Sequence, residues 1–266
     1  MDNSRSGAGD GRPVPVLRCT LRTMTTHRAP TPFAALLDLL LPRTCGGCGA
    51  GPPGSGGWCP ACADDTAGPI AVRVPGAGRV VAAARYRGPL RRAVLAYKER
   101  GCRDLAPELA ALLVPAVAAV LPGGPGAVGP ARADPGRVWL VPAPSRPSAA
   151  RARGGDHVLR LCRALAPRLT AAGLPAWVLP VLALDRRARD SVGLDAAARA
   201  ENLASALRPA GGPRRGPGPD EPVLLVDDVV TTGATLRACH PVLARIGVPA
   251  AGSVLLADAT TPVRSR

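Results

Sequence analysis

The chain has 266 residues, enough for one core domain of ordinary size and a small appendage. Its formal charge of +15 suits a polyanionic partner, but Lys98 is the only lysine and the arginine excess equally fits a coding bias, so charge alone does not indicate nucleic acid. No run approaches the roughly 18 apolar residues needed to span a bilayer, so we expect no membrane insertion and a cytoplasmic location.

The N-terminal 68 residues divide into two predicted parts. Residues 1–30 are rich in Arg, Ser, Gly and Pro without periodicity, which predicts a disordered head, and Met24 is a candidate start because interpretable sequence begins only after it. Residues 31–68 combine a short amphipathic helix, Phe33–Leu41, with a cysteine cluster in Gly- and Pro-rich sequence. We expect these residues to form a small module ahead of the main domain.

The cysteine cluster has the spacing of a zinc site. Cys45, Cys48, Cys59 and Cys62 form two CxxC pairs, and two such pairs can supply the four thiolates of a tetrahedral zinc centre. All four ligands would be cysteine, so no open coordination position remains and the zinc would be structural, as in a zinc ribbon. A redox or disulfide pair is the alternative, which a cytoplasmic location disfavours.

An alternation of strands and helices follows. Apolar runs and Gly or Pro stops predict strands over 80–86, 138–141, 177–184, 223–226 and 251–256. The helices are expected over 89–100, 104–121 (with Asp104 as N-cap), 156–172, 196–207 and 232–246, with Gly/Pro-rich linkers at 122–136 and 208–221. Such alternation is typical of an α/β fold, so we expect an open, mostly parallel sheet flanked by helices over 79–258 and a tail, 259–266.

The strand 223–226 is followed by two acids and a threonine-rich turn. Asp227 and Asp228 fall where ligands bind in open α/β sheets, and they can accept hydrogen bonds from sugar hydroxyls. The turn that begins the next helix consists of Thr231, Thr232, Gly233, Ala234 and Thr235. Hydroxyl donors and a helix N-terminus attract a phosphate, so the segment predicts a site for a ribose 5-phosphate.

Three alternatives compete with this interpretation. A Walker B strand also ends in acids, but the chain contains no GxxxxGK[ST]. A response-regulator acid pocket would leave the threonines unexplained. A strand–turn–helix with a chance acid pair stays open as the third.

The segment VLLVDDVVTTGATL (223–236) resembles the phosphoribosyl pyrophosphate (PRPP) motif of type I phosphoribosyltransferases. The resemblance implies that Asp227 and Asp228 are the catalytic acids that contact the ribose hydroxyls, and that the turn 231–235 holds the 5-phosphate. It further implies a type I phosphoribosyltransferase-like sheet and PRPP bound with Mg²⁺. The sequence does not identify an acceptor for a transferred group.

Together with the cysteine cluster, other stretches resemble the ComF family of competence-associated proteins. They are LLDLLLPRTCGGC, YRGPLRRAVLAYKERG, VPAPSRPSAARARGGDH and LDAAARAENLASAL. The resemblance covers about 33–257 and implies a role in DNA uptake or in the use of taken-up DNA, with other competence proteins as partners. Gly155, Asp156 and His157 depart from the family's pattern.

Cationic side chains are expected near a diphosphate. Phosphoribosyl transfer develops charge as diphosphate leaves, so Mg²⁺ and cations at the diphosphate carry the electrostatics. The candidate contacts to a diphosphate or to nucleic acid are Lys98, Ser145, Arg146, Arg151 and Arg153. A solvated basic loop and, for Lys98, a surface position near a helix end are the alternatives.

Two functions from different classes stay open. One is a phosphoribosyltransferase-like protein that binds PRPP or another ribose 5-phosphate. The other is a competence factor that binds single-stranded DNA through its zinc module and arginine loops, with the phosphate turn as a non-catalytic ligand sensor or scaffold. The six aromatic residues are too dispersed for an obvious stacking platform, and the sequence pairs no Ser with a His and an Asp in a recognisable nucleophile arrangement.

Overall fold

The computed structural model describes residues 44–50, 57–66, 68–121, 136–152, 154–185, 203, 205–211 and 216–260. The expected head, the helix Phe33–Leu41 and almost all of the linker 122–136 lie outside these residues. The same holds for most of the helix expected over 196–207 and for residues 261–266 of the tail.

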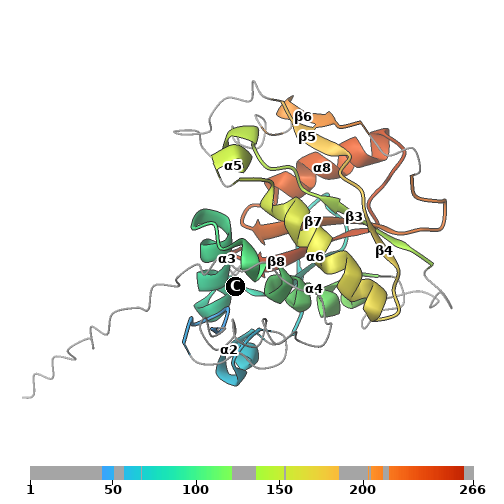
Figure 1. The fold of residues 1–266 in the computed structure, drawn as a ribbon. Helices are drawn as coiled ribbons and strands as arrows, with labels where there is room; N and C mark the ends of the chain where they lie inside the picture. Colours follow the sequence, from blue (N-terminus) through green and yellow to red (C-terminus); the bar gives the residue numbers. More distant parts are fainter. Residues whose placement is uncertain are drawn as a thin grey trace, which may run out of the picture.

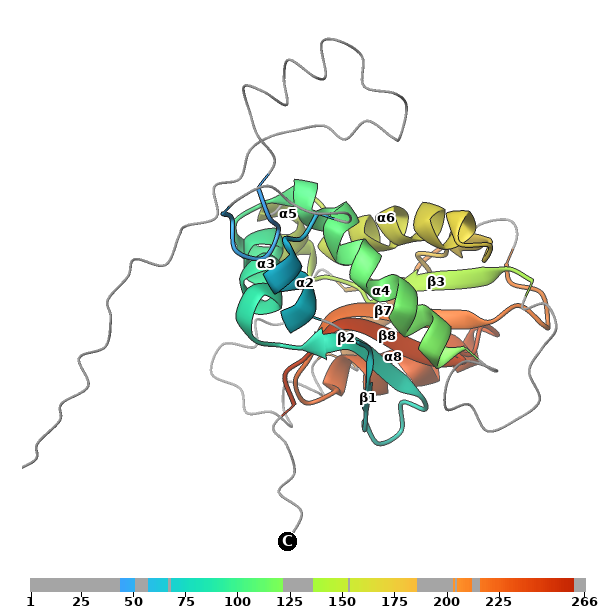
Figure 2. The same ribbon diagram turned by 90° about the horizontal axis from the view of Figure 1, so that it is seen from below.

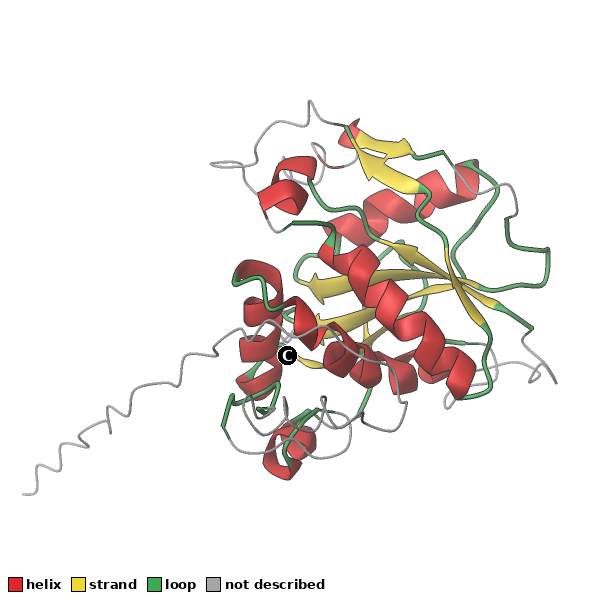
Figure 3. Cartoon of the chain, viewed as in Figure 1, coloured by secondary structure: helices red, strands yellow, loops and turns green. Residues whose placement is uncertain are grey.

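A six-stranded sheet forms the centre of the molecule (Figures 1 and 3). Its strands, in the order in which they pair, are β1 (Ile70–Val72), β2 (Val80–Arg85), β8 (Gly252–Asp258), β7 (Val223–Val230), β3 (Val138–Pro142) and β4 (Ala176–Val178). Every neighbouring pair is parallel except β1 and β2. The expected α/β fold with a mostly parallel sheet is therefore confirmed, with an unexpected antiparallel edge strand, β1.

Helices cover both faces of the sheet. Figure 2 shows α4 (Ala106–Val120) and α6 (His157–Ala171) on one face and α8 (Ala234–Arg245) on the other. Strand β7 contributes side chains to the cores on both faces, because successive residues of a strand point in opposite directions. Leu224 packs in the core on the side of α4 and α6, and Leu225 packs in the core on the side of α8. Strands buried on both faces explain the continuous apolar runs of the sequence.

The connections leave β3 and β7 in opposite directions. The chain runs from β3 through α6 to β4, towards one edge of the sheet, and from β7 through α8 to β8, towards the other. Because β3 and β7 are neighbours, their two outgoing turns separate at the carboxyl ends of the strands, which makes this point the topological switch point of the sheet. Ligands of open α/β sheets bind at such a switch point.

The prediction of a single strand over 177–184 is wrong in detail. Residues 176–178 form β4, whereas Leu182–Leu184 form β5, which pairs with β6 (Leu207–Pro209) in a separate two-stranded sheet. Pro180 lies between them and has no N–H to continue the ladder. Leu207, expected at a helix end, therefore begins a strand.

Two shorter elements also differ from expectation. The N-cap of α4 is Leu105, and Asp104 lies in the 3₁₀ turn Arg103–Leu105 rather than capping the helix. A short helix, α5 (Pro147–Ala152), follows β3 where the sequence suggested only a loop. Within the described ranges, no helix has both the length and the apolar character that crossing a membrane requires.

Candidate functional site

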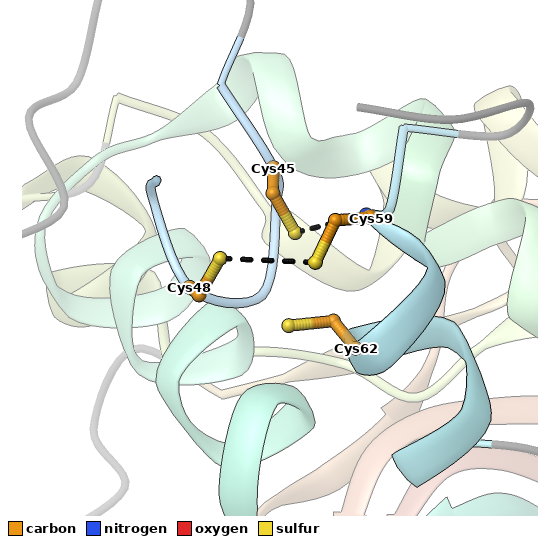
Figure 4. A group of neighbouring side chains, drawn as sticks. All are labelled: Cys45, Cys48, Cys59 and Cys62. Atoms are coloured by element: carbon orange, nitrogen blue, oxygen red, sulfur yellow. Dashed lines mark hydrogen bonds between the residues drawn. The ribbon is translucent and has the colours of Figure 1, made fainter. Parts of the chain in front are cut away.

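Four cysteine thiols meet in one cluster beside α2 (Pro60–Asp65) (Figure 4). The Sγ atoms of Cys45, Cys48, Cys59 and Cys62 all lie within 4.8 Å of one another, and those of Cys48 and Cys59 are 3.9 Å apart. A tetrahedral zinc with Zn–S bonds of about 2.3 Å needs S–S separations of about 3.8 Å. The cluster therefore fits a single zinc ion, and it fits this better than two separate redox pairs.

The electrostatics of the cluster favour a cation. The N–H groups of Gly47 and Cys59 donate to Cys45 Sγ at 3.3 and 3.2 Å. Burial disfavours the Cys45 thiolate, but backbone donors outweigh it and lower the pKa of this thiol to about 6, whereas burial and the neighbouring thiols raise the pKa of Cys62. A bound metal ion would supply the charge that ionises the remaining thiols.

The cluster is packed against the helices α3 (Gly88–Glu99) and α4. The indole N–H of Trp58 donates to the Glu108 carbonyl at 3.4 Å, and Nε–H of Arg92 donates to the Gly47 carbonyl at 3.0 Å. A Cβ atom at Gly47 would lie 2.7 Å from the Trp58 ring, so glycine is what allows the indole to cover the CxxC turn. The small module thus joins the core on the α4 side of the sheet.

Magnesium has no comparable site in the described part of the chain. There, the cysteine cluster is the only group of three or more His, Cys, Asp or Glu side chains close enough to share a metal ion. The Mg²⁺ expected with PRPP therefore stays a prediction, in which oxygens of the ligand would supply the coordination.

The acid pair lies within β7 rather than after it. The strand continues two residues past Asp228 to Val230, and Asp227 and Asp228 are only 8% and 5% exposed. Since side chains alternate along a strand, Asp227 points to the α8 face and Asp228 to the α6 face. The two carboxylates therefore have different surroundings.

Asp228 is held by two side chains from distant segments. Its Oδ2 lies 2.7 Å from Lys98 Nζ on α3 and 2.7 Å from His157 Nε2 at the start of α6, and its Oδ1 accepts the Val229 N–H at 2.7 Å. Burial opposes ionisation, but the hydrogen bond from His157 and the charge of Lys98 outweigh it and hold the pKa of Asp228 below its usual range. Lys98 thus belongs to the acid-pair site.

The pKa of Asp227 is shifted in the opposite direction. Burial and, after it, repulsion by Asp228 raise the pKa of Asp227 to about 8, although its Oδ1 accepts the Asp228 N–H at 2.8 Å. The two shifts favour ionisation of Asp228 and protonation of Asp227. A protonated carboxyl can donate as well as accept a hydrogen bond, so the pair offers a sugar two chemically different partners.

Sequence reasoning missed the role of His157. Its Nδ1 lies 3.2 Å from Ser145 Oγ, in the turn after β3, while its Nε2 contacts Asp228 from 71 residues away in sequence. The only signal was the departure from the ComF pattern at this position. A contact over that separation cannot be read from local spacing.

Ser145, His157 and Asp228 form a hydrogen-bonded series that the sequence did not indicate. Serine, histidine and aspartate in this order also occur in nucleophilic catalysis. Two contacts oppose that role: Ser145 Oγ lies 3.1 Å from Asp156 Oδ1, a competing acceptor, and Asp228 is ion-paired with Lys98. The series is better described as a structural link between the turn after β3 and the acid pair.

The threonine turn connects β7 to α8 as expected. Gly233 is the N-cap of α8 with φ +73°, the N–H of Ala234 donates to Thr232 Oγ1 at 3.4 Å, and Thr231 and Thr232 are exposed. A Cβ at Gly233 would lie 2.3 Å from Val74 Cγ1, so both the left-handed backbone and the close packing require glycine. The turn therefore presents hydroxyl groups and a helix N-terminus at the switch point of the sheet.

The arginines expected near a diphosphate are only partly placed. Arg146 and Arg151 lie at and within α5, half-buried and exposed respectively, and Arg153 lies outside the described residues. Ser145, by contrast, is fixed in the turn after β3 by its contacts to His157 and Asp156.

A cavity of about 490 Å³ opens at the carboxyl ends of β2 and β8. Its lining consists of Arg85, Tyr86, Arg87, Asp258, Ala259 and Thr260. Arg85 and Asp258 form an ion pair across it, and the Ala259 N–H donates to the Val230 carbonyl at 2.8 Å. This cavity therefore adjoins the end of β7 and the threonine turn.

Comparison with known proteins adds no family to these observations. The chain matches no protein-family model, and no curated protein is significantly similar to it.

Proposed function

We propose that this chain binds PRPP, or a related ribose 5-phosphate, at the switch point between β3 and β7. In this proposal the fold is type I phosphoribosyltransferase-like, the cysteine cluster holds a structural zinc, and the chain is a ComF-type protein that acts in DNA uptake or in the use of taken-up DNA. Competence proteins would be its partners. If the phosphoribosyl group were transferred to an acceptor, Mg²⁺ would neutralise the departing diphosphate.

The observation that carries the proposal is the acid pair beside the threonine turn at the switch point of the sheet. Asp228 already accepts three hydrogen bonds, and a carboxylate has about four lone-pair sites. One position is left for a hydroxyl of a ligand, and Asp227 offers a second carboxyl one residue away. Thr231 and Thr232 are exposed beside them, where a 5-phosphate would meet the N-terminus of α8.

Calorimetry of the zinc-loaded full chain with PRPP and Mg²⁺ tests the proposal. We expect the wild type to bind and the double variant Asp227→Asn/Asp228→Asn to bind about 100-fold more weakly, because a charged hydrogen bond to Asp228 contributes about 1.5–3 kcal/mol and a neutral one to Asp227 about 1 kcal/mol. Asp220→Asn, which changes an exposed acid in the turn before β7, is the matched control and should bind normally. Absence of binding by the wild type would contradict the proposal.

A second candidate, single-stranded nucleic-acid binding, is favoured by one surface feature. Trp177 on the edge strand β4 is 45% exposed, more than any other large apolar side chain of the described residues. The Arg137 guanidinium lies 4.3 Å from its ring centroid, and Trp139 packs edge-on against it at 5.4 Å. An exposed indole beside an arginine is the kind of group on which bases stack.

This surface can be tested separately from the acid pair, because Arg137 and Trp139 lie at the amino end of β3 and Ser145 follows its carboxyl end. Binding of a fluorescent oligothymidine should weaken about tenfold in Trp177→Ala and fall with added salt. The acid-pair double variant should bind the oligonucleotide normally. Equal binding by Trp177→Ala and wild type would remove the support that this surface gives to the second candidate.

A further inference from the structure

We propose that His157 is a positioning residue that holds the Asp228 carboxylate and ties it, through Ser145, to the turn after β3. The choice of ligand rests on the proposed function. The inference goes beyond that function because neither the acid-pair motif nor the phosphate turn assigns a role to His157. It also links two parts of the site that the sequence treats as independent.

Both nitrogen atoms of the His157 imidazole have a partner, and the ring is buried. Nε2 lies 2.7 Å from Asp228 Oδ2 and Nδ1 lies 3.2 Å from Ser145 Oγ. The Tyr97 hydroxyl donates to the His157 carbonyl at 2.6 Å, and the two rings meet edge-on with centroids 6.1 Å apart. With only 5% of the residue exposed, the ring has no room to turn away from Asp228.

Asp156 fixes the same turn to the helix that carries His157. Its Oδ1 accepts the N–H groups of Val158 and Leu159 at 2.9 and 3.1 Å as the N-cap of α6, and its Oδ2 accepts the Ser145 N–H at 3.1 Å. The start of α6 and the turn after β3 are therefore joined by both the backbone and the side chain of Ser145. A displacement of this turn would move His157, and with it the hydrogen bond to Asp228.

The link matters for a ligand with two charged ends. Asp228 would bind the sugar, while Ser145 and the following basic residues would bind a diphosphate. Lys98 on α3, whose side chain is 34% exposed, forms an ion pair with the same Asp228 oxygen that His157 contacts. If His157 is lost, Asp228 is oriented by Lys98 and the Val229 N–H alone, and the turn after β3 loses its contact with the acid pair.

Two substitutions of His157 separate the effect of its hydrogen bonds from the effect of its side-chain volume. In His157→Phe the ring volume is kept and both hydrogen bonds are lost, so we expect PRPP affinity to fall about tenfold or more. His157→Gln retains one N–H for Asp228 and one oxygen for Ser145, and its affinity should lie within about threefold of wild type. Equal affinities of His157→Phe and wild type, in protein with an unchanged melting temperature, would overturn the proposal.

The coupling to Ser145 is tested by a double-mutant cycle. Ser145→Ala should weaken PRPP binding about threefold in the wild type and clearly less in His157→Phe, where only a direct contact of Ser145 with the diphosphate is left to lose. Additive losses would show that Ser145 and His157 act independently and would overturn the link. Covalent labelling of Ser145 by a fluorophosphonate that depends on His157 would overturn it as well, because Ser145 would then be a nucleophile.

A measurement without ligand separates this proposal from the proposed function. The measurement is a ¹⁵N NMR spectrum of the histidine side chains. The signals of His157 are identified as those that are missing from the spectrum of His157→Gln. Asp228→Asn should shift its Nε2 signal and Ser145→Ala its Nδ1 signal. If wild type binds neither PRPP nor ribose 5-phosphate, the proposed function is wrong, and the two shifts alone decide whether His157 holds Asp228. Absence of both shifts would overturn the positioning role.

Discussion

The cysteine cluster and the acid-pair site are assembled in opposite ways. The cluster takes all its thiols from one short segment, Cys45 to Cys62, and packs them within 4.8 Å of one another. The acid-pair site collects side chains from α3, the turn after β3, α6 and β7, including a contact between residues 71 apart in sequence. The first site depends on local spacing, whereas the second depends on the completed sheet.

Their charges are balanced differently too. In the cluster, the donors to the Cys45 thiol are the backbone N–H groups of Gly47 and Cys59, so we expect the four thiolates to need a bound cation. At the acid pair, the chain's own Lys98 forms an ion pair with Asp228, and His157 forms a hydrogen bond with it. We therefore expect metal removal to disrupt the first site and leave the second intact.

The largest expected effect is that of zinc removal. The purified chain should carry about one zinc ion, and Cys45→Ser should lose it, because a structural zinc contributes about 10 kcal/mol or more to a small module. The loss should appear in the near-ultraviolet circular dichroism of Trp58, which is buried against Gly47. The far-ultraviolet signal of the sheet should change little.

Cys239→Ala is the matched control for this experiment. Cys239 is also buried, but it lies on α8 and outside the cluster, so zinc should stay bound. Full zinc content in Cys45→Ser would contradict the four-thiolate site. Unfolding of the whole sheet on chelation would contradict the independence of the two regions.

The second effect concerns pH and the buried Asp227. Its pKa rises from 3.8 to about 8 on folding, so between these values the folded chain holds a proton that the unfolded chain has lost. Folding stability should then fall by up to about 1.4 kcal/mol for each pH unit between 5 and 8. Urea unfolding across this range should show the slope in wild type and lose it in Asp227→Asn.

Asp228→Asn gives the opposite comparison. The pKa of Asp228 is lowered on folding, so its contribution is present above the unfolded value and is lost only as the solution becomes more acidic. This variant should be less stable throughout pH 5–8 and should keep a reduced slope, because burial remains the larger cause of the Asp227 shift. Equal slopes in wild type and Asp227→Asn would contradict the assignment.

The same contrast explains what the sequence could predict. Apolar runs with Gly and Pro stops predicted the parallel α/β sheet, and the CxxC spacing predicted the cluster, because both are local signals. Asp227, Asp228 and the threonine turn were identified because they are contiguous. The partners of Asp228 were not, since Lys98 and His157 reach it only through the packing of α3 and α6 on the sheet.

Errors in the predicted elements have an equally physical origin. The apolar run 177–184 suited one strand, but Pro180 ends the ladder and the following residues pair with Leu207–Pro209 instead. That pairing is a long-range contact and left no trace in local periodicity. The edge strand β1 was missed because three residues are too few to show a period.

The smallest predicted effect concerns the glycine at the threonine turn, and Gly247, just beyond the other end of α8, supplies a control. Gly233 and Gly247 flank α8 with φ of +73° and +78°, but a Cβ would meet Val74 only at Gly233 and nothing within 4 Å at Gly247. Gly247→Ala should therefore cost about 1 kcal/mol of folding stability for the left-handed backbone alone. Gly233→Ala should cost about 2–3 kcal/mol, because the clash adds to the same strain.

Adding Val74→Ala to Gly233→Ala separates the two causes by removing the clash but not the strain. Relative to Val74→Ala alone, the glycine substitution should then cost no more than Gly247→Ala does, as measured by urea unfolding. If the turn holds a 5-phosphate, Gly233→Ala should also weaken ribose 5-phosphate binding while Gly247→Ala leaves it unchanged. An equal loss of binding in both variants would mean that α8 as a whole, rather than the turn at its N-terminus, governs the affinity.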